Sequence, residues 1–162
     1  VCICGASVDS SGRHGLSCRK SAGRLSRHSA VNDLIKRALT SAEIPCRLEP
    51  PSLIRDDGKR PDGLSLTPWL NGKCLVWDFT CPDTFAQSHL NVAVSGPGTV
   101  ATEAEVNKRR KYSSLSATYM FVPIAVETMG ALGDEAVDFL HKLGRCVASV
   151  SGEKRATEFL LQ

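Results

Sequence analysis

The chain has 162 residues, of which 23% are charged and 42% hydrophobic, and its formal net charge is +3. This length suffices for one domain with a substantial core, and this composition excludes disordered and fibrous proteins. The apolar runs are too short for a transmembrane helix, and the start has no signal-peptide pattern. Residues 1–60 hold eleven Lys and Arg against six Asp and Glu. We therefore expect an anionic partner such as nucleic acid there, although a solvated basic surface would have the same charge.

The seven cysteines indicate a reducing, intracellular environment. An odd number does not suit a disulfide framework, and Cys46, Cys74 and Cys81 lie in or beside apolar segments, where a reduced cysteine is a small core residue. The chain starts without Met, and residues 153–162 have the pattern of a helix cut short. We therefore expect a fragment of a longer polypeptide.

The first twenty residues are rich in Gly and Ser and contain four potential metal ligands. They are Cys2, Cys4, His14 and Cys18, with the spacing C-x1-C-x9-H-x3-C. Thiolates and an imidazole in a loop without its own core are typical of a structural Zn²⁺ site, although the C-x-C pair is closer than usual. The alternative is a set of scattered cysteines beside a surface histidine.

A basic stretch follows, and it holds the main candidates for phosphate contacts. These candidates are Arg19, Lys20, Arg24, Arg27 and His28. A helix should begin at Ser26, because apolar residues recur at positions 31, 34, 35, 38 and 39 with the spacing of one helical face. Pro45 should end this helix.

The next segment should form three strands. Cys46–Glu49 has the pattern of a short strand, and Asp56-Asp57-Gly58 is a turn signal. Asn71-Gly72 separates two apolar runs, residues 63–70 and 73–80. An Asn-Gly pair in that position is a strong signal for a β-hairpin.

Two acids lie at the open end of this hairpin. Asp62 belongs to Pro-Asp-Gly, a common turn sequence, whereas Asp78 ends the apolar run Cys74–Trp77, where an unpaired carboxylate is costly to bury. If the hairpin closes at Asn71-Gly72, the two acids lie at the same end of the sheet. Two carboxylates there suit Mg²⁺, which can activate water for phosphodiester hydrolysis. The alternative is a plain hairpin with a turn at each end.

A second helix should follow the polar loop of residues 83–101. Thr102 and Glu105 have the spacing of a capping box and predict that the helix begins at Thr102. Lys108 and Tyr112 share a helical face with Glu105. Lys108 could neutralise a phosphate or orient water, with Tyr112 in support, or this face could be a solvated basic surface.

The last part of the chain should add a strand and a third helix. Residues 119–126 form a buried-strand pattern in which Pro123 indicates a sheet edge or a bulge. A helix should begin near Asp134. The order α, β, β, β, α, β, α predicts an α/β fold in which a mixed sheet is flanked by helices.

In this order, the motifs resemble those of a known nuclease family. The likeness rests on the Cys-Cys-His-Cys segment, an Arg-His pair in a helix, Glu49-Pro50, Arg60-Pro61-Asp62 and the later Asp78, and it covers roughly residues 2–126. The chain is similar to the restriction-like endonuclease domain at the C-terminus of reverse transcriptases from site-specific non-LTR retrotransposons. That domain belongs to the PD-(D/E)xK class.

The resemblance implies a restriction-endonuclease-like αβββαβ core with an N-terminal zinc-knuckle-like segment. Residues 1–24 would form the knuckle and a basic linker, residues 25–150 the nuclease core, and residues 151–162 the start of a C-terminal helix. The implied catalytic residues are Asp62, Asp78, Lys108 and Tyr112, and the two acids would bind Mg²⁺ or Mn²⁺.

The chain also departs from the pattern of the class. Thr80 stands where most members have a catalytic Lys, so the resemblance gives that role to Lys108, with Lys111 as a rival. Glu49 would be an accessory acid.

The resemblance finally implies the function. The domain would nick target DNA for target-primed reverse transcription, in a nuclear protein whose parent chain also handles RNA, with no membrane partner. Two alternatives stay open: a catalytically inactive nucleic-acid-binding domain on the same scaffold, and a structural zinc-containing interaction domain.

Overall fold

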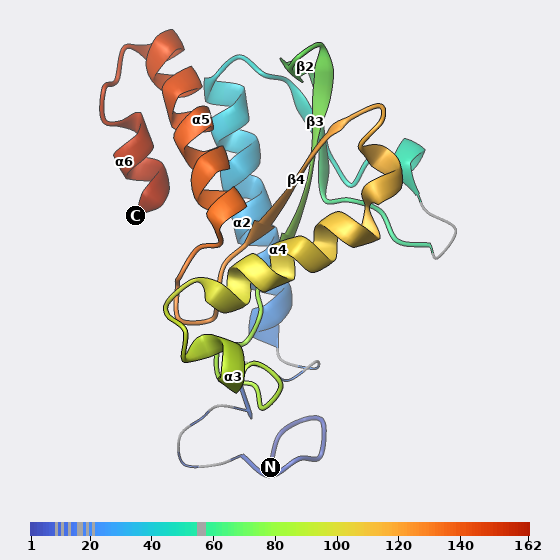
Figure 1. Ribbon diagram of the computed structural model, residues 1–162, viewed down its shortest axis with the longest axis vertical. Coiled ribbons are helices and arrows are strands. Elements are labelled where there is room, and N and C mark those ends of the chain that lie inside the picture. Colours follow the sequence, from blue (N-terminus) through green and yellow to red (C-terminus); the bar gives the residue numbers. More distant parts are fainter. Residues whose placement is uncertain are drawn as a thin grey trace.

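The centre of the molecule is a four-stranded mixed sheet with helices on both faces (Figure 1). The computed structural model describes the chain except for residues 9, 11, 13, 16, 17, 19, 21 and 55–57 and the side chains of Ala22 and Arg24. Predicted features at Arg19, at the side chain of Arg24 and at most of the turn of residues 56–58 therefore lie outside the described residues. The α/β class predicted from the sequence is confirmed.

The sheet has the strand order β1-β2-β3-β4. Its strands are β1 Cys46–Leu48, β2 Gly63–Leu70, β3 Lys73–Thr80 and β4 Met120–Ala125. β1, β2 and β3 pair antiparallel, and β4 pairs parallel to β3. Asn71 and Gly72 have φ of 51° and 73°, the left-handed pair that a tight type I′ hairpin turn requires, so the predicted hairpin is confirmed. Pro123 lies on an edge strand, as predicted.

Alternation along β3 sends its side chains into two separate clusters. The odd-numbered side chains pack in the larger cluster with helices α2, Ala22–Ser41, and α5, Asp134–Ser151. They are Leu75, Trp77 and Phe79. Val76 packs on the other face with Tyr112 and Phe121. Asp78 has the same parity as Val76, and so it belongs to the face that α4, Thr99–Lys111, covers.

The remaining observations concern the helices. α2 begins four residues before the predicted Ser26, and a short helix α3, Leu90–Ala93, interrupts the loop of residues 83–101. α6, Ala156–Leu161, packs against α5, in agreement with the helical pattern of the last residues (Figure 1). Within the described part of the chain, none of the helices has both the length and the apolar character needed to cross a membrane.

The predicted capping box at Thr102 is wrong. α4 already begins at Thr99, after Gly98 with a φ of 85°. The carboxylate of Glu127, distant in sequence, accepts the N–H groups of Val100 and Ala101 at 3.2 and 3.4 Å. A helix start leaves such N–H groups without intrahelical partners, and here a tertiary contact satisfies them in place of the local motif.

Glu105 has a different role from the one its spacing suggested. Its buried carboxylate accepts the N–H groups of Glu135 and Ala136, both at 2.9 Å, at the start of α5. One acid thus caps α4 and another, carried by α4, caps α5. These contacts fix α4 against β4 and α5.

Candidate active site

Asp78 lies near the end of β3, and two side chains of the α4 segment contact its carboxylate. Only 4% of Asp78 is exposed. Its Oδ2 forms an ion pair with Lys108 Nζ, and its Oδ1 accepts the Tyr112 hydroxyl at 2.8 Å. A carboxylate without partners would be costly to bury, so these contacts explain how an acid can follow the apolar residues of β3.

Asp62 lies against β3 and not on an exposed turn. Its N–H donates to the carbonyl oxygen of Trp77 at 3.0 Å, and its Oδ2 accepts the N–H of Phe79 at 2.6 Å. These partners are the residues on either side of Asp78, and only 13% of the Asp62 side chain is exposed. The hairpin therefore brings the two acids to the same end of the sheet, as the sequence analysis expected.

His28 of α2 completes the cluster. Its Nε2 lies 3.2 Å from Asp62 Oδ2, and its ring meets the Phe79 ring edge-on at 5.5 Å between centroids. The hydrogen bond with Asp62 raises the pKa of His28 most strongly, burial opposes the rise, and the charge of Asp78 adds to it. The positive charge of Lys108 lowers the pKa of this imidazole, but it is the weakest of these effects. The sequence analysis grouped His28 with the phosphate contacts, and no local pattern indicated its contact with Asp62.

Glu49 and Arg60 border the same site. The two side chains form an ion pair, and the Glu49 N–H donates to the Asp62 carbonyl at 2.7 Å. A cavity of about 250 Å³ opens between α2 and this end of the sheet, with His28, Glu49 and Asp62 in its lining. The accessory acid suggested by the resemblance thus lies beside the candidate site, with 65% of its side chain exposed.

The structure separates the two candidate catalytic lysines. Lys108 contacts the carboxylate of Asp78 directly, whereas Lys111 lies 3.2 Å from the Tyr112 hydroxyl and 4.6 Å from the centroid of that ring. The face that carries Lys108 and Tyr112 is therefore not the solvated basic surface considered as an alternative, because Tyr112 and Glu105 are each only 1% exposed.

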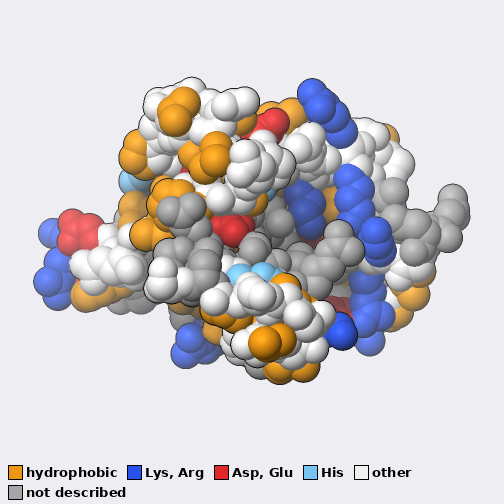
Figure 2. Space-filling view, turned by 90° about the horizontal axis from the view of Figure 1, so that it is seen from below, with side chains coloured by type: hydrophobic (Ala, Val, Ile, Leu, Met, Phe, Trp, Pro, Cys, Tyr) orange, Lys and Arg blue, Asp and Glu red, His pale blue; other side chains and the backbone are white. Residues whose placement is uncertain are grey.

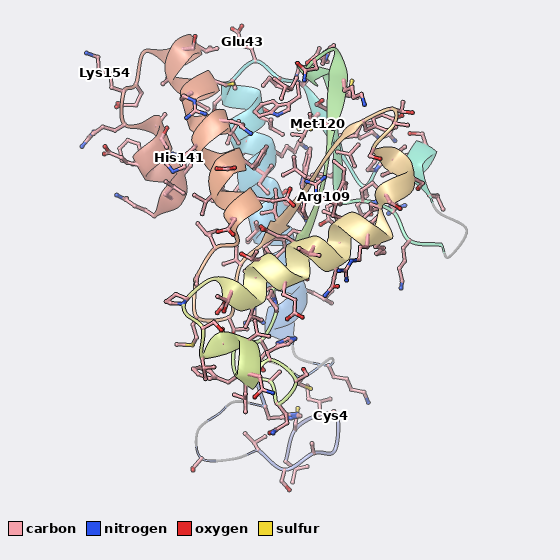
Figure 3. The ribbon with its side chains drawn as sticks, viewed as in Figure 1. Cys4, Glu43, Arg109, Met120, His141 and Lys154 are labelled. Atoms are coloured by element: carbon pink, nitrogen blue, oxygen red, sulfur yellow. The ribbon has the colours of Figure 1, made fainter. Side chains whose placement is uncertain are left out.

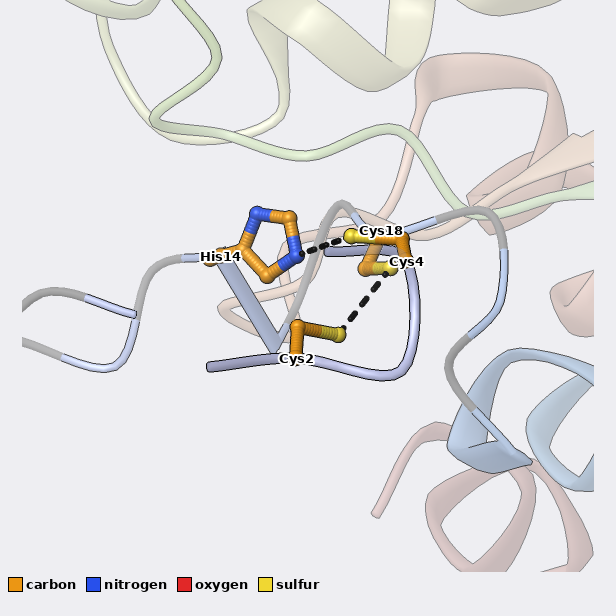
Figure 4. A group of neighbouring side chains, drawn as sticks. All are labelled: Cys2, Cys4, His14 and Cys18. Carbon is orange, nitrogen blue, oxygen red and sulfur yellow. Dashed lines mark hydrogen bonds between the residues drawn. The ribbon is translucent and has the colours of Figure 1, made fainter. Parts of the chain in front are cut away.

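The four predicted zinc ligands come together at the N-terminus (Figure 4). The ligand atoms of Cys2, Cys4, His14 and Cys18 all lie within 4.8 Å of one another. Cys4 Sγ is 3.1 Å from His14 Nε2, and Cys2 Sγ is 3.6 Å from Cys18 Sγ. Ligands placed about 2.3 Å from a tetrahedral Zn²⁺ are roughly 3.8 Å apart, so the donor set and its spacing fit a metal ion such as zinc.

Local backbone hydrogen bonds shape this cluster. The Cys2 N–H donates to the Ala6 carbonyl at 2.8 Å, and the Cys18 N–H donates to the His14 carbonyl at 2.9 Å. A backbone hydrogen bond at Cys4, followed by one with the Cys18 side chain, lowers the pKa of Cys2 to about 6. The thiolate is the form that binds metal, so the lowered pKa favours ligation at Cys2, whereas the pKa of the neighbouring Cys18 is raised.

Basic side chains gather on one side of the face shown in Figure 2. In Figure 2, Lys and Arg gather on the right of the face shown, the side on which α4 ends in Figure 1. The last turn of α4 is wholly basic, and Arg110 is exposed. Arg109 points the other way and pairs with Glu135 at the start of α5 (Figure 3). Of the predicted phosphate contacts, Lys20 is exposed and Arg27 is half-buried.

Comparisons with known proteins identify no family for this chain, so its function has to be argued from the geometry of its residues. No protein-family model matches the chain, and a search of curated proteins gives no match.

Proposed function

We propose that this chain is a metal-dependent DNA endonuclease domain that nicks DNA by hydrolysing a phosphodiester bond. The observation that carries the proposal is that Asp62 and Asp78 lie at the same end of the sheet and that Lys108 pairs with Asp78. Two carboxylates can hold a divalent ion for phosphodiester hydrolysis and an ammonium can stabilise the charge that develops, and the order Asp, Asp, Lys along the chain is that of the PD-(D/E)xK class.

The carboxylates of Asp62 and Asp78 would hold the ion. Both are hard oxygen ligands, which suit Mg²⁺ or Mn²⁺. When bound, such an ion supplies Lewis acidity, lowering the pKa of a water ligand and neutralising charge on the phosphate. Phe79 holds Oδ2 of Asp62 and Tyr112 holds Oδ1 of Asp78, so the ion would take Oδ1 of Asp62 and would share Oδ2 of Asp78 with Lys108.

Lys108 supplies positive charge beside Asp78. An ammonium in this position can stabilise the negative charge that develops on a phosphate oxygen during hydrolysis. Tyr112 holds Asp78 Oδ1 through its hydroxyl, and Lys111 lies against that tyrosine. We assign the catalytic lysine as Lys108, since it touches the metal-binding carboxylate.

DNA would lie along the basic side seen in Figure 2. Arg110 is exposed in the last turn of α4, and in the sequence the predicted contacts Lys20 and Arg27 follow the Cys/His cluster. Contacts from Lys and Arg to phosphates are sequence-independent and sensitive to salt. Zn²⁺ at Cys2, Cys4, His14 and Cys18 would order the N-terminal segment, which leads directly to Lys20.

The biological setting follows from the resemblance described above. The domain would act in the nucleus as part of a retrotransposon-encoded reverse transcriptase, with target DNA as its substrate and RNA as a partner of the parent chain.

The test is nicking of supercoiled plasmid in the presence of Mg²⁺ or Mn²⁺. The unaltered chain should convert the plasmid to the open-circular form, and Asp78→Ala should abolish nicking while DNA binding is retained. Lys108→Met should lower the rate at saturating metal by about 100-fold or more, whereas Lys111→Met should have a much smaller effect. Binding without cleavage by the unaltered chain would favour the catalytically inactive DNA-binding domain instead.

A further inference from the structure

A series of hydrogen bonds connects the core of the protein to Asp62. The indole N–H of Trp77 lies 3.0 Å from Asn32 Oδ1, and Asn32 Nδ2 lies 3.1 Å from His28 Nδ1. His28 Nε2 lies 3.2 Å from Asp62 Oδ2. Trp77 is fully buried and Asn32 is 6% exposed, so water cannot replace either partner at the first link.

The direction of each hydrogen bond follows from the chemistry of the groups. An indole N–H can only donate, so the atom of Asn32 that faces Trp77 is the amide oxygen. The NH₂ group of Asn32 then faces His28, and because it too can only donate, Nδ1 of His28 accepts. The proton of the neutral imidazole must therefore be on Nε2, from which it is donated to Asp62 Oδ2.

The two carboxylate oxygens of Asp62 have different surroundings. Oδ2 accepts two N–H donors, from Phe79 and from His28. No hydrogen bond to Oδ1 is found within the described residues, so Oδ1 is the oxygen left to bind a cation. Nε2 of His28 carries a proton in both the neutral and the charged imidazole, and so it cannot itself ligate a metal.

We propose that His28 is a positioning residue that orients Asp62, presenting Oδ1 to the metal ion, and that Asn32 and Trp77 select the tautomer that does this. The proposal rests on the proposed function, because it assumes that Asp62 binds the metal. Side chains that hold a metal ligand from behind contribute to affinity without touching the ion.

Metal affinity tests this role without depending on nicking. The probe is Mn²⁺, titrated into the full chain and followed by electron paramagnetic resonance, with Asp78→Asn defining the signal that belongs to the carboxylate site. His28→Ala should weaken Mn²⁺ binding by about 10-fold to 100-fold. His28→Gln, whose amide can still donate to Asp62, should stay within about threefold of the unaltered chain. His141→Ala, on α5 away from the site, is the matched control and should change nothing (Figure 3).

The tautomer can be observed directly in the metal-free protein. With ¹⁵N-labelled histidine, the His28 signals, assigned by their loss in His28→Gln, should show a protonated Nε2 and an unprotonated Nδ1 at alkaline pH. Nε2 should keep its proton when Mg²⁺ is added.

The possible results separate the two proposals. Unchanged Mn²⁺ affinity in His28→Ala would overturn the positioning role, and so would an Nδ1–H tautomer. Loss of the Nε2 proton on addition of Mg²⁺, with His28→Gln as defective as His28→Ala, would make His28 a metal ligand instead. If the unaltered chain binds no Mn²⁺ at the carboxylates, the proposed function itself fails and the metal-positioning role fails with it. The tautomer of the metal-free protein would then still show whether the hydrogen-bond series exists.

Discussion

Removing the ammonium of Lys108 should destabilise the folded protein far more than removing a neighbouring charge on the same helix. The Asp78 side chain is 5% exposed and that of Lys108 is 23% exposed, so Lys108→Met leaves a buried carboxylate with one partner lost. Breaking such a pair costs about 3–5 kcal/mol, and because Lys108 is partly exposed we expect a loss of about 3 kcal/mol. With a urea m-value of about 2 kcal/mol/M, the unfolding midpoint should fall by roughly 1.5 M.

Arg109→Met is the control for this prediction. Arg109 pairs with Glu135, but its side chain is 49% exposed, and an exposed pair contributes at most about 1 kcal/mol. Unfolding should be followed by circular dichroism without added divalent metal ions. The double variant Asp78→Asn/Lys108→Met has no unpaired buried charge and should regain about 1–3 kcal/mol relative to the sum of the single variants. Equal losses for Lys108→Met and Arg109→Met, or strict additivity in the double variant, would refute the reasoning.

Four other predictions concern the surroundings of the site. Tyr112→Phe, which removes a hydroxyl donor to the buried Asp78, should cost about 1–3 kcal/mol in urea unfolding, and no loss would contradict the observed hydrogen bond. Gly63→Ala places a Cβ 2.0 Å from the Trp77 indole and should lower the free energy of unfolding by about 1–3 kcal/mol. The unfolding transition followed by tryptophan fluorescence should then occur at a lower urea concentration. Burial raises the pKa of Glu105, so its contribution to stability is full below about pH 4.5 and is lost as pH rises through the raised pKa. Glu105→Gln should flatten that decline in thermal unfolding measured against pH, and an unchanged profile would exclude this residue as its source. Cys18→Ser should abolish stoichiometric zinc measured by atomic absorption, whereas retained zinc would place the metal elsewhere.

The parts of the fold that could be predicted depend on local rules. Asn71-Gly72 fixed the hairpin because this pair readily adopts the left-handed conformation at both positions. The turn sets Leu70 opposite Lys73, but two register shifts between Leu64 and Leu70 bring Gly63 opposite Trp77 and so place Asp62 beside Asp78. The turn signal predicts which end of the sheet the acids share, but it does not predict these shifts. An acid at the end of an apolar strand must have partners, and a lysine and a tyrosine at helical spacing supplied candidates for them.

The parts that could not be predicted depend on contacts between distant segments. The start of α4 is set by Glu127, which follows that helix in the sequence, and so the local capping motif at Thr102 was misleading. The contact between His28 and Asp62 depends on how α2 is rotated about its axis above the strand end. Apolar periodicity identifies the buried face of α2, but it does not specify which polar residue at the edge of that face meets a given carboxylate.

The most direct test of the account is the Mg²⁺ dependence of plasmid nicking by the unaltered chain and by Asp62→Asn, at equal DNA occupancy. The account predicts that the unaltered chain nicks DNA only when Mg²⁺ or Mn²⁺ is added, and that Asp62→Asn binds DNA equally well but does not nick it at any metal concentration. Cleavage by Asp62→Asn at the rate of the unaltered chain, or cleavage that persists without a divalent ion, would contradict it.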